Sequence, residues 1–194
     1  MLIALNKPFG TICQFSPSGD KPTLKQFVSL GGVYPAGRLD TDSEGLLLLT
    51  DDGILQARIA DPRHKLVKTY LVQVEGSPTD LQLDMLRRGV DLGDFVTLPA
   101  IVKRLAAAPV LWERDPPVRF RREIPTCWLE ISISEGKNRQ VRRMTAKAGF
   151  PTLRLVRTAI GPIDLGKLAP GKWRQIDPAL LPGPNASRPK TPAK

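Results

Sequence analysis

Residues 37–53 read GRLDTDSEGLLLLTDDG, and this stretch decides how the chain is arranged. Its first nine residues, 37–45, are too polar and too rich in glycine for regular structure, which predicts a loop flanked by strands. Residues 46–49 are an unbroken apolar run of strand length, and Asp51-Asp52-Gly53 is a turn signal. The stretch therefore predicts a polar loop that leads directly into a buried strand.

The segments around this stretch alternate short strands with a few helices. We expect strands at residues 2–5, 46–49, 69–75, 96–105, 126–134 and 152–160. Helical spacing or composition predicts helices at 24–30, 54–60, about 81–89 and 137–148, the last with Gly149 as its C-cap. This order is typical of an α+β protein with a mainly antiparallel sheet and flanking helices, not of a doubly wound parallel sheet.

The length of 194 residues and an apolar content of 41% suit a globular chain with a real core. We expect one catalytic domain over residues 1–177 and a disordered basic tail over 178–194, because five prolines and few apolar residues occupy that tail. The sequence has neither an apolar run of membrane-helix length nor a signal-peptide core. It predicts a cytoplasmic protein that makes no use of a membrane.

The inventory of special residues is short. A single histidine, His64, and two distant cysteines, Cys13 and Cys127, cannot build a zinc ribbon or a metalloprotease site, so we expect no metal. A cysteine nucleophile with His64 as its base stays open as an alternative. The sequence also lacks the glycine-rich motifs of dinucleotide and nucleoside triphosphate sites, which argues against such cofactors.

The charge is concentrated in the second half of the chain. Lys and Arg outnumber Asp and Glu by 29 to 19, a formal net charge of +10. Residues 1–100 hold 10 basic and 12 acidic residues, whereas residues 101–194 hold 19 basic and 7 acidic ones. Many of the basic residues lie within patterned segments, so we interpret them as a binding face for a polyanion.

Three polar segments stand out as candidates for chemistry, and each also has a plain structural explanation. Residues 37–45 place one arginine and three acids in a short loop, which is also what a turn-rich polar loop looks like. In Lys68-Thr69-Tyr70 the tyrosine begins a strand and is equally explained as a half-buried strand residue. Residues 135–144 form a turn into a helix rich in Arg, Asn and Gln, which a solvated helix face would also explain.

Together, these segments resemble the pseudouridine synthases, in the branch of the ribosomal small-subunit synthase and its large-subunit relatives. The matching strings are LNKP at 5–8 with Gly10, the stretch 37–53, Lys68-x-Tyr70, EGKNRQVRRM at 135–144, and Leu155-x-Arg157 with Ile160-Gly161-Pro162. They cover nearly the whole chain to about Trp173. The resemblance implies the catalytic fold of that family, with a central RNA-binding cleft.

The resemblance also implies a reaction and its residues. A uridine is detached at N1, turned and rejoined through C5, without a cofactor. Asp40 is expected to attack the base or the sugar, or to abstract a proton at C2′. Arg142 would keep Asp40 charged, and Tyr70 would stack on the uracil and help remove the C5 proton.

Further residues are expected to bind RNA by resemblance or by charge. Arg38 would fill the space that the flipped uridine leaves, and Leu155 would line the uracil pocket. The other expected RNA-binding residues are Lys7, Lys68, Lys137, Asn138, Arg139, Arg143, Arg154 and Arg157.

One departure from the family pattern indicates which RNA is the substrate. Most members of the branch begin with a small S4 domain, yet here the LNKP motif starts at Leu5 and leaves no room for it. The chain is most similar to large-subunit synthases without that domain, which implies 23S rRNA or a large-subunit assembly intermediate as the partner of a monomer. Two alternatives stay open, a non-catalytic ribosome-assembly factor and an RNA glycosidase that releases uracil.

Overall fold

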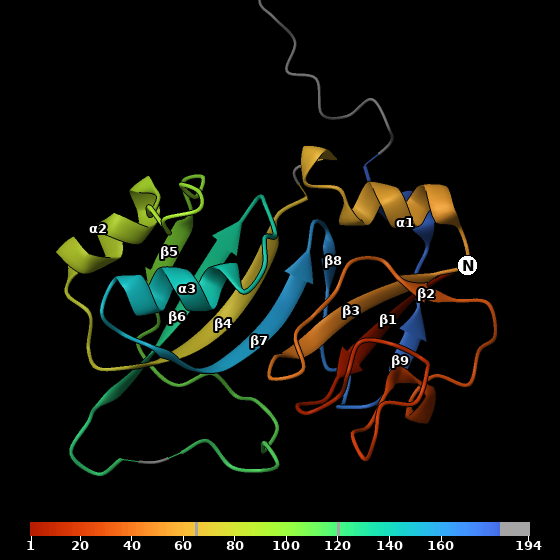
Figure 1. Cartoon of the computed structure of the whole chain (residues 1–194), viewed down its shortest axis with the longest axis horizontal. Coiled ribbons are helices and arrows are strands. Elements are labelled where there is room, and N and C mark those ends of the chain that lie inside the picture. The colour runs from red at the N-terminus through yellow and green to blue at the C-terminus, as the bar shows by residue number, and fades with distance from the viewer. Residues whose placement is uncertain (65, 120, 183–194) are drawn as a thin grey trace, which may run out of the picture.

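A nine-stranded sheet forms the body of the protein in the computed structural model, which describes residues 1–182 except 65 and 120 (Figure 1). Its main path runs β5-β6-β4-β7-β3-β1-β9, with β2 paired to β3 and β8 paired to β7. The strands are β1 Leu2–Lys7, β2 Tyr34–Pro35, β3 Glu44–Thr50, β4 Lys68–Glu75, β5 Ile101–Arg104, β6 Thr126–Ile133, β7 Thr152–Ile160, β8 Ile163–Asp164 and β9 Trp173–Gln175.

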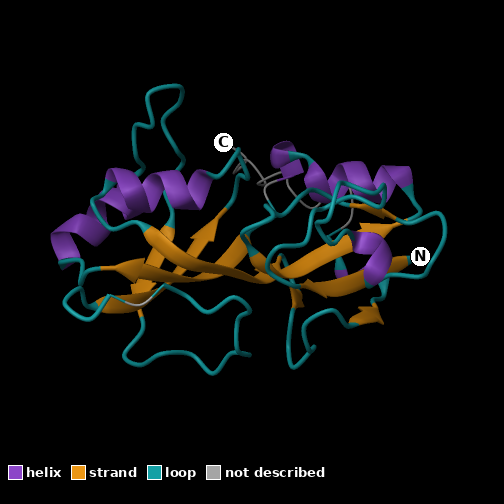
Figure 2. Ribbon diagram, turned by 60° about the horizontal axis from the view of Figure 1, so that its bottom comes forward, coloured by secondary structure: helices purple, strands orange, loops and turns teal. Residues whose placement is uncertain are grey.

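Three α-helices lie against the sheet: α1 Gly53–Ala60, α2 Asp80–Arg88 and α3 Gln140–Lys147. Figures 1 and 2 show α2 and α3 over the half of the sheet that contains β5, β6, β4 and β7, while α1 covers the other half. The Asp52 side chain caps α1 by accepting hydrogen bonds from the backbone amides of Ile54 and Leu55. A capping box between Thr79 and Gln82 starts α2.

The apolar runs of β1 and β3 are explained by burial on both faces. Ile3 and Leu5 of β1 belong to the larger core, together with β4, β6 and α3, whereas Leu2 and Ala4 belong to a second core beneath α1. The four leucines of β3 divide between the two cores in the same alternation. A strand that is buried on both faces needs no alternating polar positions, which is why residues 2–5 and 46–49 are uninterrupted apolar runs.

The two halves of the sheet meet at a short parallel joint. Glu44 and Gly45 of β3 pair with Val156 and Arg157 of β7, and every other strand pair in the described sheet is antiparallel. A Cβ at Gly45 would lie 2.3 Å from the Arg157 carbonyl oxygen, and Gly45 has φ +99°. Only glycine allows the two strands to approach so closely at this point.

The predicted fold class is confirmed, and several predicted elements need correction. Residues 24–30 form only a 3-10 helix over Leu24–Gln26, because Leu24 and Val28 are held in the core while two glycines follow. The predicted strand at 96–105 is limited to β5, and the predicted helix at 137–148 begins at Gln140. The sheet does not end with β7, since β8 and β9 follow it.

The C-terminal boundary also differs from the predicted one. Pro178–Leu180 form a 3-10 helix and Leu181 is buried in the second core, so the folded domain extends past residue 177. The rest of the predicted disordered tail, 183–194, lies outside the described residues. In the part of the chain that the structure describes, no helix has the length and apolar character needed to cross a membrane.

Candidate active site

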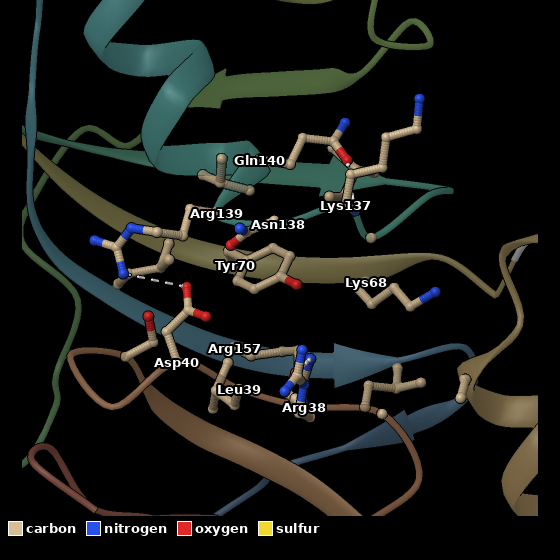
Figure 3. A pocket seen from close by; sticks show the side chains of 18 of the residues that line it. Arg38, Leu39, Asp40, Lys68, Tyr70, Lys137, Asn138, Arg139, Gln140 and Arg157 are labelled. Atoms are coloured by element: carbon tan, nitrogen blue, oxygen red, sulfur yellow. Dashed lines mark hydrogen bonds and ion pairs between the residues drawn. The ribbon is translucent and has the colours of Figure 1, made fainter. Parts of the chain in front are cut away.

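A cleft of about 290 Å³ opens beside the joint of β3 and β7. Its walls come from residues 36–43 ahead of β3, from β4, from β7, and from the turn at 136–141 that begins α3. Figure 3 shows these segments, far apart in the sequence, facing one space. Nine of the predicted site residues line it, namely Arg38, Asp40, Lys68, Tyr70, Lys137, Asn138, Arg139, Leu155 and Arg157.

Asp40 lies in a loop that the backbone fixes at several points. The Ser43 amide donates to the Asp40 carbonyl at 3.0 Å, and the Gly10 amide donates to the Thr41 carbonyl at 2.8 Å. Leu39 beside it is buried in the larger core. The carboxylate itself stays 37% exposed and faces the cleft, so it is accessible to a bound molecule while its backbone is held.

Tyr70 enters the cleft from β4. It pairs across the sheet with Ile131 of β6 and Arg157 of β7, next to a register irregularity between Thr69 and Tyr70. The residue is buried, and Figure 3 shows its ring and hydroxyl directed into the same space as the Asp40 carboxylate. A carboxylate and a phenol thus share one cleft, an arrangement suited to attack on a planar ring and to proton transfer.

Two arginines of the α3 segment meet the Asp40 loop, and their pairing differs from the prediction. Arg139 Nη1 lies 3.6 Å from Asp40 Oδ2. Arg142 instead pairs with Asp42, its Nε lying 3.4 Å from Asp42 Oδ2 while its Nη2 donates to the Asp42 carbonyl at 2.6 Å. The guanidinium that reaches Asp40 is therefore that of Arg139, because Arg142 points to the other acid of the loop.

Asp42 is the acid that contacts both arginines of this cluster. Arg139 donates two hydrogen bonds to it, at 3.1 Å to Oδ1 and 2.8 Å to Oδ2. Burial alone would raise the pKa of Asp42, but the Arg139 hydrogen bond and the charges of Arg142 and Arg139 outweigh it and lower that pKa. The Asp42 hydrogen bond raises the pKa of Arg139, and burial lowers that of Arg142.

Lys7 does not lie on an RNA-facing surface, contrary to the prediction. Its side chain is fully buried and donates to the carbonyls of Pro8 at 3.0 Å and Thr11 at 2.8 Å. No ion pair reaches it among the described residues, and burial lowers its pKa to about 8. Lys7 thus fixes the turn after β1 that supports the Asp40 loop.

Arg154 and Arg157, which are predicted to contact phosphates, are both buried. Burial argues against a phosphate contact by Arg154, whereas a contact by Arg157, which lines the cleft, stays a prediction. Arg154 forms two hydrogen bonds of 2.9 Å with Glu44, and both side chains are buried. Arg157 is 5% exposed and donates from Nε to the Leu46 carbonyl at 2.7 Å. Both arginines join β7 to β3, although Arg157 also borders the cleft.

The remaining predicted cations lie at or near the rim. Arg143 pairs with the exposed Asp94, and Lys137 Nζ lies 3.6 Å from the centroid of the Phe95 ring. Lys68 lines the cleft and is nearly buried, and burial followed by the charge of Arg157 lowers its pKa. Arg38 is exposed at the mouth and accepts, through its carbonyl, a hydrogen bond from Arg157 at 3.4 Å.

The cysteine alternative loses its support. Burial raises the pKa of both the Cys13 and the Cys127 thiols, which is the opposite of what activates a thiol nucleophile. His64 lies in a 3-10 helix after α1 and is not among the residues that line the cleft. Within the described residues no group of three or more His, Cys, Asp or Glu is placed to hold a metal ion.

The sequence analysis missed the functional contacts of two acids, Asp42 and Glu44. Both lie within the nine-residue loop that was singled out, yet only Asp40 was given a role there. The available signal was the presence of three acids in one short segment of a chain whose second half is rich in arginine; Asp42 pairs with Arg139 and Arg142, and Glu44 pairs with Arg154. Which acid pairs with which cation depends on the three-dimensional arrangement, and spacing alone does not determine it.

Comparisons with known sequences and structures all match this chain to pseudouridine synthases. Residues 1–147 match the family model described as RNA pseudouridylate synthase. The chain is 60% identical over 179 residues to "Ribosomal large subunit pseudouridine synthase E" of Xanthomonas campestris pv. campestris, covering 91% of this chain and 96% of that protein. It is 58% identical over 175 residues to the protein of the same name from Vibrio vulnificus, covering 90% and 74%. A solved structure, "Crystal structure of pseudouridylate synthase", shares 31% identity with a TM-score of 0.74, covering 92% of this chain and 70% of that one.

Proposed function

The chain belongs to the RNA pseudouridylate synthase family, and from that premise we propose that it isomerises a uridine of large-subunit ribosomal RNA, in the 23S molecule. Two relatives at 60% and 58% identity are named as large-subunit synthases, and the matches extend over most of both chains. The reaction breaks the N1–C1′ bond of the uridine and forms a C5–C1′ bond. The N1 position gains a proton and C5 loses one, so the overall change is an isomerisation.

The observation that carries this proposal is the meeting of Asp40 and Tyr70 in one cleft, with the Arg139 guanidinium 3.6 Å from the Asp40 carboxylate. Asp40 acts first, as a nucleophile on the base or sugar or as a base at C2′. The Arg139 guanidinium provides a counter-charge beside the Asp40 carboxylate. Tyr70 lies against the uracil and takes part in removing the proton from C5.

The target uridine must leave its stack to reach an enclosed carboxylate, at a cost of a few kcal/mol. Arg38 is exposed at the mouth of the cleft, beside Asp40 in sequence, and we assign its planar guanidinium to the space that the base leaves. Leu155 contributes an apolar surface to the pocket for the uracil. Lys137, Asn138 and Arg139 line the α3 side of the cleft, where the RNA backbone would pass.

The test is complementation of cells that lack the protein, with pseudouridine mapped across 23S rRNA by mass spectrometry. We expect one uridine to lose its modification and to regain it when the wild-type gene is supplied. Asp40→Asn should fail to restore it although its carboxamide has the same shape, because an amide is neither a nucleophile nor a base here. Asp84→Asn, which removes an exposed carboxylate paired with Arg87 on α2, is the matched control and should restore it.

Other outcomes would contradict the proposal. Full restoration by Asp40→Asn would favour a non-catalytic assembly factor. Release of free uracil from rRNA by the purified protein would indicate a glycosidase. Unchanged modification of 23S rRNA in the deletion strain would exclude this RNA as the substrate. We expect a monomer that acts in the cytoplasm, where the ribosomal subunits are made.

A further inference from the structure

We propose that Asp42 is a positioning residue for the reaction, because its carboxylate holds the Arg139 guanidinium against Asp40 and neutralises the half-buried Arg142. This inference rests on the proposed function and adds to it a residue that does not itself touch the substrate. Asp42 contacts both arginines, whereas Asp40 has one ion pair, with Arg139, among the described residues. The two acids are two positions apart in one loop.

Arg139 needs an anchor to stay near Asp40. Its side chain is 45% exposed, and its distance of 3.6 Å from Asp40 is that of a loose ion pair at a surface. Its two hydrogen bonds to Asp42, at 3.1 and 2.8 Å, have the bidentate geometry that fixes a guanidinium plane. The contact with Asp40 is therefore a consequence of the stronger contact with Asp42.

The backbone of Arg139 supports the same conclusion. Arg139 has φ 48° and ψ 31°, and in the described part of the chain it is the one residue other than glycine with a positive φ. This left-handed conformation is unfavourable for a side chain such as arginine and persists where surrounding contacts impose it. It lies directly before α3, at the point where the chain turns toward the Asp40 loop.

Arg142 gives Asp42 its second task. The Arg142 side chain is 13% exposed, and its Nε has no hydrogen bond although it lies 3.4 Å from Asp42 Oδ2. The nearest carboxylate is that of Asp42, and its backbone carbonyl also accepts from Arg142 Nη2. Without Asp42 this cation would lose its counter-ion and would compete with Arg139 for Asp40.

The test combines Asp42→Asn and Arg139→Gln in a double-mutant cycle, with single-turnover rates measured at saturating 23S rRNA. Each single variant should slow pseudouridine formation by about 100-fold, the scale of a misplacement of ~1 Å. In Asp42→Asn, which removes a negative charge, the RNA concentration for half saturation should stay the same or fall. The double variant should lose less rate than the product of the two single losses, because Asp42 acts in part through Arg139. Asp42→Glu should recover part of the rate.

The matched control is Asp94→Asn, which removes the carboxylate paired with Arg143 of α3. This variant should keep the wild-type rate.

A measurement without RNA separates this inference from the proposed function. The Nε–H signals of Arg139 and Arg142 in ¹⁵N spectra should move in Asp42→Asn and stay in place in Asp94→Asn, whatever the substrate. Unmoved signals, a wild-type rate for Asp42→Asn, or losses in the double variant that multiply would each overturn the role of Asp42. Absence of pseudouridine formation by the wild-type protein, with the signals moved as expected, would count against the proposed function instead.

Discussion

Lys7 carries an ionisable group inside the protein, and its pKa of about 8 lies below the usual 10.5 because of burial. In the unfolded chain the amine keeps its proton up to a higher pH than it does in the folded chain. Between about pH 8 and 10.5 the unfolded state therefore binds more protons, so rising pH stabilises the fold in that window. Below about pH 8 the Lys7 amine is protonated in both the folded and the unfolded chain, so the free-energy cost of burying its charge does not change with pH.

This gives a prediction for the pH dependence of stability. From pH 7 to pH 10 the free energy of unfolding of the wild type should rise relative to that of Lys7→Met by up to about 3 kcal/mol. Urea denaturation of both proteins at several pH values measures the difference. A constant difference across this range would mean that Lys7 has an ordinary pKa in the folded protein.

The ring and hydroxyl of Tyr70 have separable tasks. Tyr70→Phe keeps the face that lies against uracil, where stacking contributes roughly 1–3 kcal/mol, so RNA binding should be nearly unchanged. Tritium release from RNA labelled at uridine C5 should fall by about 100-fold, the scale of general acid–base assistance. Tyr70→Leu should also weaken capture of the base. Wild-type tritium release by the Phe variant would reassign the proton transfer to water or Asp40.

Among the structural elements, β3 and β7 depend most on side chains for their pairing. Their parallel ladder is only two residue pairs long, and the buried Glu44–Arg154 pair spans the same joint. Trp112 Nε1 donates to Glu44 at 2.8 Å, and the Trp112 carbonyl accepts from Arg154 at 2.9 Å. The long connection between β5 and β6 is thereby attached to the sheet next to the Asp40 loop.

Removal of one charge from this joint should be costly. Glu44→Gln leaves the buried Arg154 guanidinium without a counter-ion, so it should lower the free energy of unfolding by about 3–5 kcal/mol. Asp84→Asn, at an exposed ion pair, should change it by less than about 1 kcal/mol. Chemical denaturation of the three proteins checks both values. Equal stability of Glu44→Gln and the wild type would show that the ion pair does not secure the joint.

The elements that the sequence predicted well are those with a strong pattern. The apolar runs in β1 and β3, the alternation of β4 and the glycine after α3 each have one structural explanation. β2, β8 and β9 have two or three residues each and show no period, because they form only where a neighbouring strand offers free backbone groups.

In the candidate site, as in the fold, the sequence predicted only the residues that belong to a strong local pattern. Motifs pointed to Asp40 and Tyr70, which the structure brings to one cleft, whereas Lys7, Arg154 and Arg157 were expected to bind RNA and are buried. Their burial depends on partners from distant segments, such as Glu44 and the Leu46 carbonyl for the two arginines. No local pattern in the sequence reports such partners.

At the scale of the molecule, charges that are separated along the sequence are mixed in the fold. Acids of the first half pair with arginines of the second half, as in Asp42 with Arg139, Glu44 with Arg154, and Asp94 with Arg143. The surface available to RNA therefore has fewer unpaired cations than the composition implies. The net charge of +10 nevertheless leaves RNA binding electrostatically favourable.

Binding of the RNA substrate should weaken as the salt concentration rises, and more steeply the more phosphates the protein contacts. The logarithm of the affinity should fall linearly with the logarithm of salt concentration, by about 0.7 for each phosphate contacted in single-stranded RNA. Arg154→Met should leave this slope unchanged because Arg154 is buried, whereas Lys137→Met should reduce it. Titrations of labelled RNA at several salt concentrations give the slopes. An affinity independent of salt would contradict an electrostatic interface.

The position of β9 has a consequence for biosynthesis. β9 covers one edge of β1, and the Ile176 amide bonds to the Leu2 carbonyl, so the first strand is completed by nearly the last part of the chain. At 5–20 residues per second, ribosomes release β1 on the order of ten seconds before β9. During that interval β1 can pair with β3 but its other edge stays open, and an open strand edge is a template for aggregation. This edge of the sheet is therefore protected only after residues 173–176 have been synthesised.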